Sequence, residues 1–273
     1  MSIKSPRSNS ARLALAGVAF LGLAFAIGKR ATSAPVGPGA PGEAGFRAMY
    51  PAGPVAASTT FAGVDLAKLD TSLSAAGLRL GSREDHVVDD GGVVLPYLDA
   101  AGDVRLLVKI AVARDSAAAR RFADAELHAV QLVLSKVTDP ALGDHVFADD
   151  AGRGEAIVVG AAGNVGFLVH VRAGATAAPR ASVVASALRS AAVEGVLTSP
   201  TATVSLPSVV PLAGAPFTVT PGAGATLHLR AEGAYVAKGR LLRPFAAGPV
   251  TLVATVADDL GRVAEVRTSA VAK

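Results

Sequence analysis

The 273-residue chain contains no cysteine and no tryptophan, and only 4% of its residues are aromatic. The absence of cysteine excludes disulfide bonds, thiolate metal ligands, a thiol nucleophile and a lipid-modified N-terminal cysteine, but it leaves the redox compartment open. Hydrophobic residues make up 51% of the chain, and many of them are alanine and valine. We therefore expect a core built mainly from small side chains, which can still pack densely.

Acidic residues are missing from the start of the chain, where none precedes Glu43. Five of the 26 basic residues lie within the first 34 positions, which leaves 21 basic residues against 22 acidic ones in the remainder. The pI near 9.6 therefore reflects the N-terminal segment and not the body of the protein. A nucleic-acid-binding protein would carry basic clusters interleaved with aromatic residues. We accordingly predict no nucleic-acid partner.

Residues 1–33 have the three-part pattern of a secretory signal: a basic segment, an apolar core of fifteen residues and then small residues. That core is shorter than the ~20 residues of a membrane-spanning helix, which predicts a signal peptide cleaved before Ala34. Lys29 and Arg30 follow the core directly and resist translocation, so an uncleaved signal anchor is the alternative. Either outcome predicts an extracytoplasmic protein: periplasmic, secreted, or held at the membrane through the N-terminal segment alone.

Proline and glycine recur through residues 34–57, which read APVGPGAPGEAGFRAMYPAGPVAA. Both residues interrupt regular backbone structure, so this stretch predicts a linker between the leader and the first folded domain. The stretch contains no clean PxxP array, so a proline-rich recognition motif is not favoured.

Residues 58–198 predict an α+β domain, an antiparallel sheet with helices on one face, because helical and strand periodicities alternate along them. In the longest predicted helix, Ala119, Ala123 and Leu127 begin an apolar stripe. Pro96 predicts that its strand lies at a sheet edge. The predicted helices are 64–77, 116–136 and 179–194, and the predicted strands are 93–99, 104–113, 144–150, 155–162 and 164–173.

Residues 199–273 predict a second, all-β domain because helical spacing gives way to short alternating runs separated by turns. Phe217 and Val219, and likewise Leu227 and Leu229, occupy alternate positions and are expected to point inward. The junction at residues 198–202 has little apolar surface to bury, so we expect few contacts between the two domains.

The C-terminal stretch GPVTLVATVADDLGRVAEVRTSAVAK resembles the closing hairpin of bacterial immunoglobulin-like and PKD-like modules. The WDFGDG-type segment of PKD domains is missing, which favours an Ig-like β-sandwich. The stretch ALGDHVFADDAGRGEAIVVGAAGNVGFLVHV is similar to small exported α+β domains of bacterial envelopes, which are mostly uncharacterised or thought to bind ligands. That similarity brings no catalytic residues to this chain.

Three loops share the pattern D-D-x-G: residues 89–92, 149–152 and 258–261. Calcium binding is one interpretation, but calcium requires six to eight oxygen ligands in an ordered spacing. Turn formation is the simpler interpretation, because aspartate caps local amides and glycine accepts a positive φ.

The densest group of metal-ligand residue types in the chain comprises Glu84, Asp85, His86, Asp89 and Asp90. A histidine among carboxylates could bind zinc or manganese, whereas a solvated loop is the alternative interpretation. The sequence contains no HExxH, G-x-S-x-G or phosphate-binding G-x-x-x-x-G-K-[ST] motif.

Taken together, these patterns favour an exported envelope protein that works by non-catalytic binding or scaffolding, with no cofactor. The predicted partner is an envelope protein or a cell-wall component. A serine, histidine and aspartate set could still assemble from distant positions. The alternative function is therefore an envelope hydrolase, with its best candidate site among residues 84–90.

Overall fold

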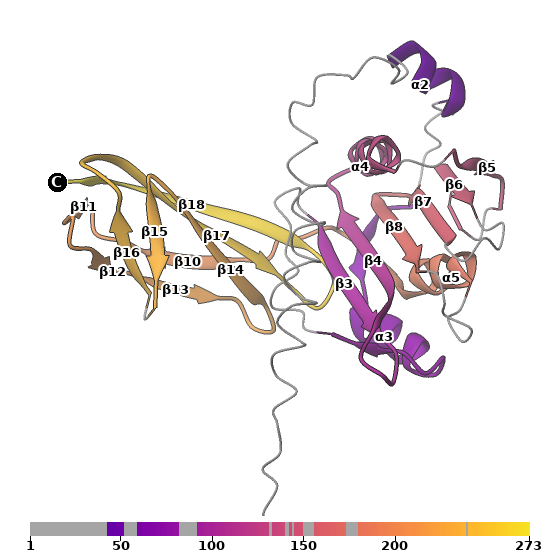
Figure 1. Cartoon of the computed structure of the whole chain (residues 1–273), viewed down its shortest axis with the longest axis horizontal. Coiled ribbons are helices and arrows are strands. Elements are labelled where there is room, and N and C mark those ends of the chain that lie inside the picture. The colour runs from indigo at the N-terminus through magenta and orange to yellow at the C-terminus, as the bar shows by residue number, and fades with distance from the viewer. Residues whose placement is uncertain are drawn as a thin grey trace, which may run out of the picture. The chain divides into compact units, whose positions relative to one another are not determined.

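The computed structural model describes residues 43–51, 59–81, 92–130, 133–139, 142–143, 145–149, 156–172, 180–238 and 240–273 (Figure 1). The chain divides into two compact units, Met1–Pro51 and Ala52–Lys273. The predicted leader lies outside the described residues, so its cleavage stays a prediction. Among the described helices, none has the length and apolar character needed to cross a membrane.

The described residues of the first unit, 43–51, form a short helix, α2 (Glu43–Met49), inside the segment predicted to be a linker without regular elements. The helix occupies a stretch without proline, between Pro41 and Pro51 in the sequence. One turn is closed by the hydrogen bond that Tyr50 N donates to Phe46 O at 2.8 Å. The rings of these two residues lie 5.0 Å apart, centroid to centroid. Local side-chain contacts thus accompany a helix that composition alone did not predict.

The second unit contains a seven-stranded sheet in which every neighbouring pair is antiparallel, as predicted. Its central strands β7 and β8 are buried on both faces. In spatial order the strands are β2 (Arg79–Leu80), β3 (Val93–Leu98), β4 (Val104–Val112), β8 (Val165–Val171), β7 (Ala156–Ala162), β6 (His145–Asp149) and β5 (Ser135–Val137).

Helices cover both faces of this sheet, which corrects the prediction that they cover only one. Helices α3 (Leu66–Ser74) and α5 (Ala181–Ala191) pack with the strand residues of one face in a shared apolar core. Helix α4 (Ser116–Ala129) packs on the opposite face, and Figure 1 shows α4 and α5 on opposite sides of β7 and β8. The close approach of α4 depends on Gly166, where an added Cβ atom would lie 2.7 Å from the Phe122 ring. Strands buried on both faces require a cover on each side.

The termini of the helices follow from local sequence. Asp65 caps α3 by accepting a hydrogen bond from the backbone N–H of Lys68. Asp115 caps α4 in the same way, with the backbone N–H of Ala118 as the donor. Helix α4 ends at Ala129, earlier than the predicted residue 136, because Val130 has extended backbone angles and strand β5 begins at Ser135. Ala119, Ala123 and Leu127 are buried as the stripe predicts, and Leu134 is buried outside the helix.

Pro96 lies one strand inward from the edge, not at the edge itself. Among the described strands, the two-residue β2 alone lies outside its strand β3. The Pro96 carbonyl accepts a hydrogen bond from Gly81 N at 2.8 Å, so the proline nitrogen faces the same outer side. No ladder bond to β4 is lost there, which explains how the sheet tolerates this proline.

A buried asparagine links the sheet to the strand pair β1 (Phe61–Val64) and β9 (Ala192–Glu194). Asn164, in the turn between β7 and β8, accepts a hydrogen bond from Phe61 N at 2.6 Å. Its amide group donates to Phe61 O and to Ala113 O, each at 2.9 Å. One side chain thereby pairs three backbone groups contributed by two distant segments, which fixes the position of β1.

The described residues from 199 to 273 form strands joined by turns and loops, and these strands surround a second apolar core. Phe217 and Val219 are buried as predicted, whereas Leu227 and Leu229 are half-buried and pack against that core. Three sheets contribute: β10 (Ala202–Ser205) with β13 (Thr218–Pro221); β11 (Val209–Val210), β18 (Val263–Ala272), β17 (Gly248–Ala257) and β14 (Thr226–Glu232); and β12 (Ala215–Pro216), β16 (Leu241–Pro244) and β15 (Ala234–Ala237).

The tip of the β17–β18 hairpin joins the all-β residues to the seven-stranded part of the unit. Leu260 O accepts a hydrogen bond from Val64 N at 2.8 Å, and Asp259 O accepts one from Leu66 N at 3.0 Å. Ala257 and Val263, which flank the tip, pack with the first core and not the second. The sequence indicated few contacts across residues 198–202; the contacts come instead from a hairpin about 60 residues further along the chain.

Candidate functional site

The residues predicted as a metal site, Glu84 to Asp90, lie outside the described residues, so that site stays a prediction. Within the part of the chain that the structure describes, no group of three or more His, Asp or Glu side chains is arranged to hold a metal ion.

The most concentrated set of buried charges lies between α4 and the sheet. Alternation along β4 directs Lys109 toward α4, away from the main core, because its cross-strand neighbour Leu168 shares the face that carries Gly166. Its ammonium group forms an ion pair with Glu126, and these side chains are 12% and 8% exposed. The Lys109 ammonium also lies 5.2 Å from the centre of the Phe122 ring. Glu126 and Phe122 occupy successive turns of α4, so both partners are supplied by one helix.

A second polar pair joins α4 to strand β6. His145 Nε2 lies 3.2 Å from Asp124 Oδ1, and the side chains are 2% and 15% exposed. The imidazole also makes an edge-on contact with the Phe147 ring, 5.0 Å between centroids. A histidine–carboxylate pair can orient a proton-transferring imidazole. The His145–Asp124 pair is enclosed by protein. We therefore interpret it as a contact that attaches α4 to the sheet.

Sequence patterns did not identify either polar pair of α4, Lys109 with Glu126 or Asp124 with His145, as a site. Asp124 is not part of the apolar stripe of α4, and in the structure its carboxylate lies 3.2 Å from His145 Nε2. Neither Lys109 nor Glu126 was predicted as a site residue. A usable signal was present for Lys109, because a lysine inside the apolar run VRLLVKIAV requires a partner if the strand is buried on both faces.

The third D-D-x-G loop has the geometry of a turn. Asp258 Oδ1 accepts hydrogen bonds from the backbone N–H groups of Leu260 and Arg262, at 3.0 and 3.1 Å. Gly261 adopts φ +67°, and Arg262 pairs with the remaining Asp258 oxygen at 2.6 Å. The carboxylate is thus used within the turn, as the turn interpretation predicts. The other two loops lie partly outside the described residues.

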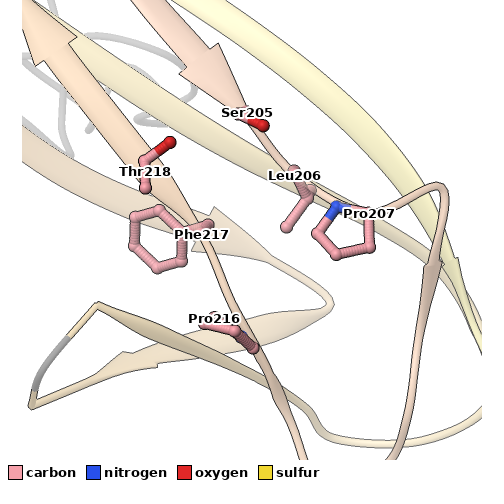
Figure 2. Close-up of a pocket in the computed structure, with 6 residues that line it drawn as sticks. All are labelled: Ser205, Leu206, Pro207, Pro216, Phe217 and Thr218. Atoms are coloured by element: carbon pink, nitrogen blue, oxygen red, sulfur yellow. The ribbon is translucent and has the colours of Figure 1, made fainter.

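An open pocket of about 320 Å³ lies in the all-β part (Figure 2). Leu206 and Pro207, which follow β10, face Phe217 across it, and Pro216 closes one end. Ser205 and Thr218 supply the polar atoms at its rim. The position of Phe217 is set by Arg240, whose carbonyl accepts from Phe217 N at 3.1 Å and whose guanidinium donates to Val219 O at 2.6 Å. A shallow apolar pocket with two hydroxyls can accept a small apolar group but brings no nucleophile and base together.

Comparison with known proteins gives no family model that matches this chain and no matching curated protein.

Proposed function

We propose that this is an exported protein of the cell envelope, periplasmic, secreted or anchored by its N-terminal segment, that works as a non-catalytic binding or scaffolding protein. Its partner is an envelope protein or a cell-wall component. The basic, apolar and small-residue order of residues 1–33 supports export.

One observation carries the scaffolding role: the attachment of the β17–β18 hairpin to strand β1. Each strand of this hairpin has ten residues and extends about 33 Å. Its tip is hydrogen-bonded through Leu260 and Asp259 to residues that precede and begin α3. Strands β11 and β14 pair along the same hairpin. This arrangement suits an all-β module that holds a second surface at a fixed distance from the seven-stranded sheet.

We further propose that residues 199–273 are an Ig-like β-sandwich. Three sheets around one apolar core support this proposal, together with the closing hairpin and its Asp258–Gly261 turn. Such modules serve as spacers or docking modules, which agrees with the scaffolding role.

Export is tested by mass spectrometry of the N-terminus of the protein isolated from its cells of origin. We expect a chain that begins near Ala34. A peptide that retains Met1 or Ser2 on most molecules in the membrane fraction would instead establish the signal anchor, and a full-length chain in the cytoplasm would refute export.

Scaffolding is tested by crosslinking in intact cells and identification of the captured molecules. We expect one reproducible envelope partner. The test variant is Leu260→Asp, which places a charge in the tip contact. It should change the capture pattern relative to the parent chain without altering export. Identical capture by both chains would contradict a role for the fixed spacing.

A further inference from the structure

The outward face of the three-stranded sheet β12–β16–β15 carries an exposed group of aromatic and basic side chains. Antiparallel pairing places Tyr235 directly opposite Arg243, while Ala234 and Leu242, at adjacent positions, point into the core. Phe245 follows β16 and donates its backbone N–H to Gly233 O at 3.1 Å, which extends the pairing by one position. Tyr235, Arg243 and Phe245 therefore share the solvent-facing side.

The two aromatic rings of this face lie together in contact with solvent. Tyr235 is 44% exposed and Phe245 is 72% exposed. Their ring centroids are 5.9 Å apart and the ring planes differ by 27°. In a chain with only 4% aromatic residues, two adjacent exposed rings form an apolar surface of the kind that marks a binding site.

The positive charges of this face lack partners of opposite sign. Residues 233–257 include Lys238, Arg240 and Arg243 but no aspartate or glutamate. Lys238 and Arg243 are exposed, and neither has an ion pair or side-chain hydrogen bond among the described residues. The stem of Arg243 packs beside β12, where a Cβ atom added to Gly214 would lie 2.8 Å from Arg243 Cγ. The stem of Arg243 therefore lies beside the backbone at Gly214, and its guanidinium has no ion pair among the described residues.

The outer face of the neighbouring four-stranded sheet shows the opposite arrangement. Arg230 pairs with Glu232 and Glu265, each at 3.1 Å. Arg267 pairs with the same two carboxylates, at 3.0 and 3.3 Å. One face of the all-β part thus neutralises its own charges, whereas the other leaves its cations for a molecule that brings negative charge.

We propose that the aromatic–basic face, defined by Tyr235, Arg243 and Phe245 and flanked by Lys238 in the turn that follows β15, binds an acidic polysaccharide whose sugar units carry carboxylates. A guanidinium pairs with a carboxylate through two parallel hydrogen bonds. The apolar faces of sugar rings pack against the two aromatic rings. This inference rests on the proposed function, because it names the cell-wall component that the module contacts.

The number of charges separates this ligand from other polyanions. Nucleic-acid binding commonly uses about six to ten phosphate contacts, and recognition of an anionic membrane uses clusters of about four to eight Lys or Arg residues. Arg243 on the aromatic–basic face and Lys238 in the adjoining turn are two exposed cations without ion pairs among the described residues, which suits the isolated carboxylates of a sugar chain. Recognition of an acidic peptide by side chains uses clusters of arginine residues, whereas Arg243 is the one arginine among the residues that define this face.

The test measures binding of the full exported chain to polygalacturonate, with the carboxyl-reduced neutral polymer as the matched ligand control. We expect Arg243→Gln and Phe245→Ala each to weaken binding by about tenfold or more. The matched protein control is Arg267→Gln on the self-neutralised face, which should change affinity less than about twofold. All four side chains of the proposed site are outside the core, and equal melting temperatures would verify that each variant is folded.

The proposal is overturned if polygalacturonate does not bind, if the neutral polymer binds equally well, or if Arg243→Gln and Phe245→Ala bind like the parent. Tighter binding to phosphatidylglycerol vesicles or to polyglutamate would assign the face to a membrane or to an acidic peptide and would also reject it. Failure here together with capture of a reproducible envelope partner in the crosslinking experiment would leave the scaffolding function intact, so the two proposals fail separately.

Discussion

Leu260 and Val64, 196 positions apart in the chain, are joined by a backbone hydrogen bond of 2.8 Å between Leu260 O and Val64 N. The bond places the β17–β18 tip against strand β1. The same contact excludes a side chain at position 63, because a Cβ atom there would lie 2.6 Å from both Cβ and O of Leu260. Gly63 is therefore required by the approach of a distant segment.

Replacement of Gly63 by alanine should displace the hairpin tip and lower the free energy of unfolding by about 1–3 kcal/mol. Urea denaturation measures this change. Thr198→Ala is the comparison, because it removes only the exposed hydrogen bond from Arg262 to Thr198 and should have an effect below about 1 kcal/mol. A Gly63→Ala chain as stable as the parent would show that the tip contact adjusts without cost.

A chain that ends at residue 198 should be less stable than the same residues in the full protein. It loses the hydrogen bonds from Leu260 and Asp259 and leaves the part of the first core beside Ala257 and Val263 uncovered. We expect its melting temperature to fall by about 5 °C or more, which corresponds to more than 1 kcal/mol in a domain of this size. Thermal unfolding followed by circular dichroism measures it. Equal melting temperatures would instead establish residues 58–198 and 199–273 as independent domains, as the sequence suggests.

Removal of one partner of the Lys109–Glu126 ion pair should lower the stability of the fold strongly, whereas replacement of both partners by apolar residues should lower it little. Lys109→Met alone leaves a carboxylate in a site where Glu126 is 8% exposed, and we expect a loss of about 3–5 kcal/mol. The double variant Lys109→Met/Glu126→Leu removes both charges and should recover most of that loss. Urea denaturation of the parent, both single variants and the double variant measures the coupling. Additive losses would contradict a direct pair.

Asp115 should give α4 a stability that depends on pH. Its side chain accepts a hydrogen bond from Ala118 N at 2.7 Å. This bond, helped by the charge of Arg114, keeps the pKa of the Asp115 carboxyl below its usual value of 3.8. Because the pKa is lowered in the folded state, the stabilisation is complete above the usual value and disappears as the pH falls through the folded one.

We therefore expect Asp115→Ala to lower the melting temperature by about 2–4 °C at pH 7. The difference from the parent should shrink as the pH falls below 3.8. Asp115→Asn is the control, because asparagine caps a helix without titrating and should stay close to the parent at pH 7. A difference that stays constant down to pH 2 would show that the carboxylate charge has no part in the cap.

Local sequence determined the elements whose causes lie within a few residues. The strand pair β3–β4, the caps at Asp65 and Asp115, and the turn at Asp258–Gly261 were predictable, because apolar periodicity, capping oxygens and positive-φ glycines act over short distances. The antiparallel character of the larger sheet followed from the same patterns, whereas the spatial order of its strands did not. The end of α4 did not, because Leu134 keeps the helical spacing of the apolar stripe although it lies outside the helix.

Tertiary structure alone decided which faces these elements bury. The placement of α4 opposite α5, the pairing of Lys109 with Glu126 and the attachment of Leu260 to Val64 all join segments whose contact no local pattern encodes. The same holds for the candidate binding face, because Tyr235 and Arg243 become neighbours only through the register of β15 and β16. Periodicity predicts whether a residue is buried or exposed. The residue that it contacts is determined by long-range packing, because each apolar face must pack against a complementary surface.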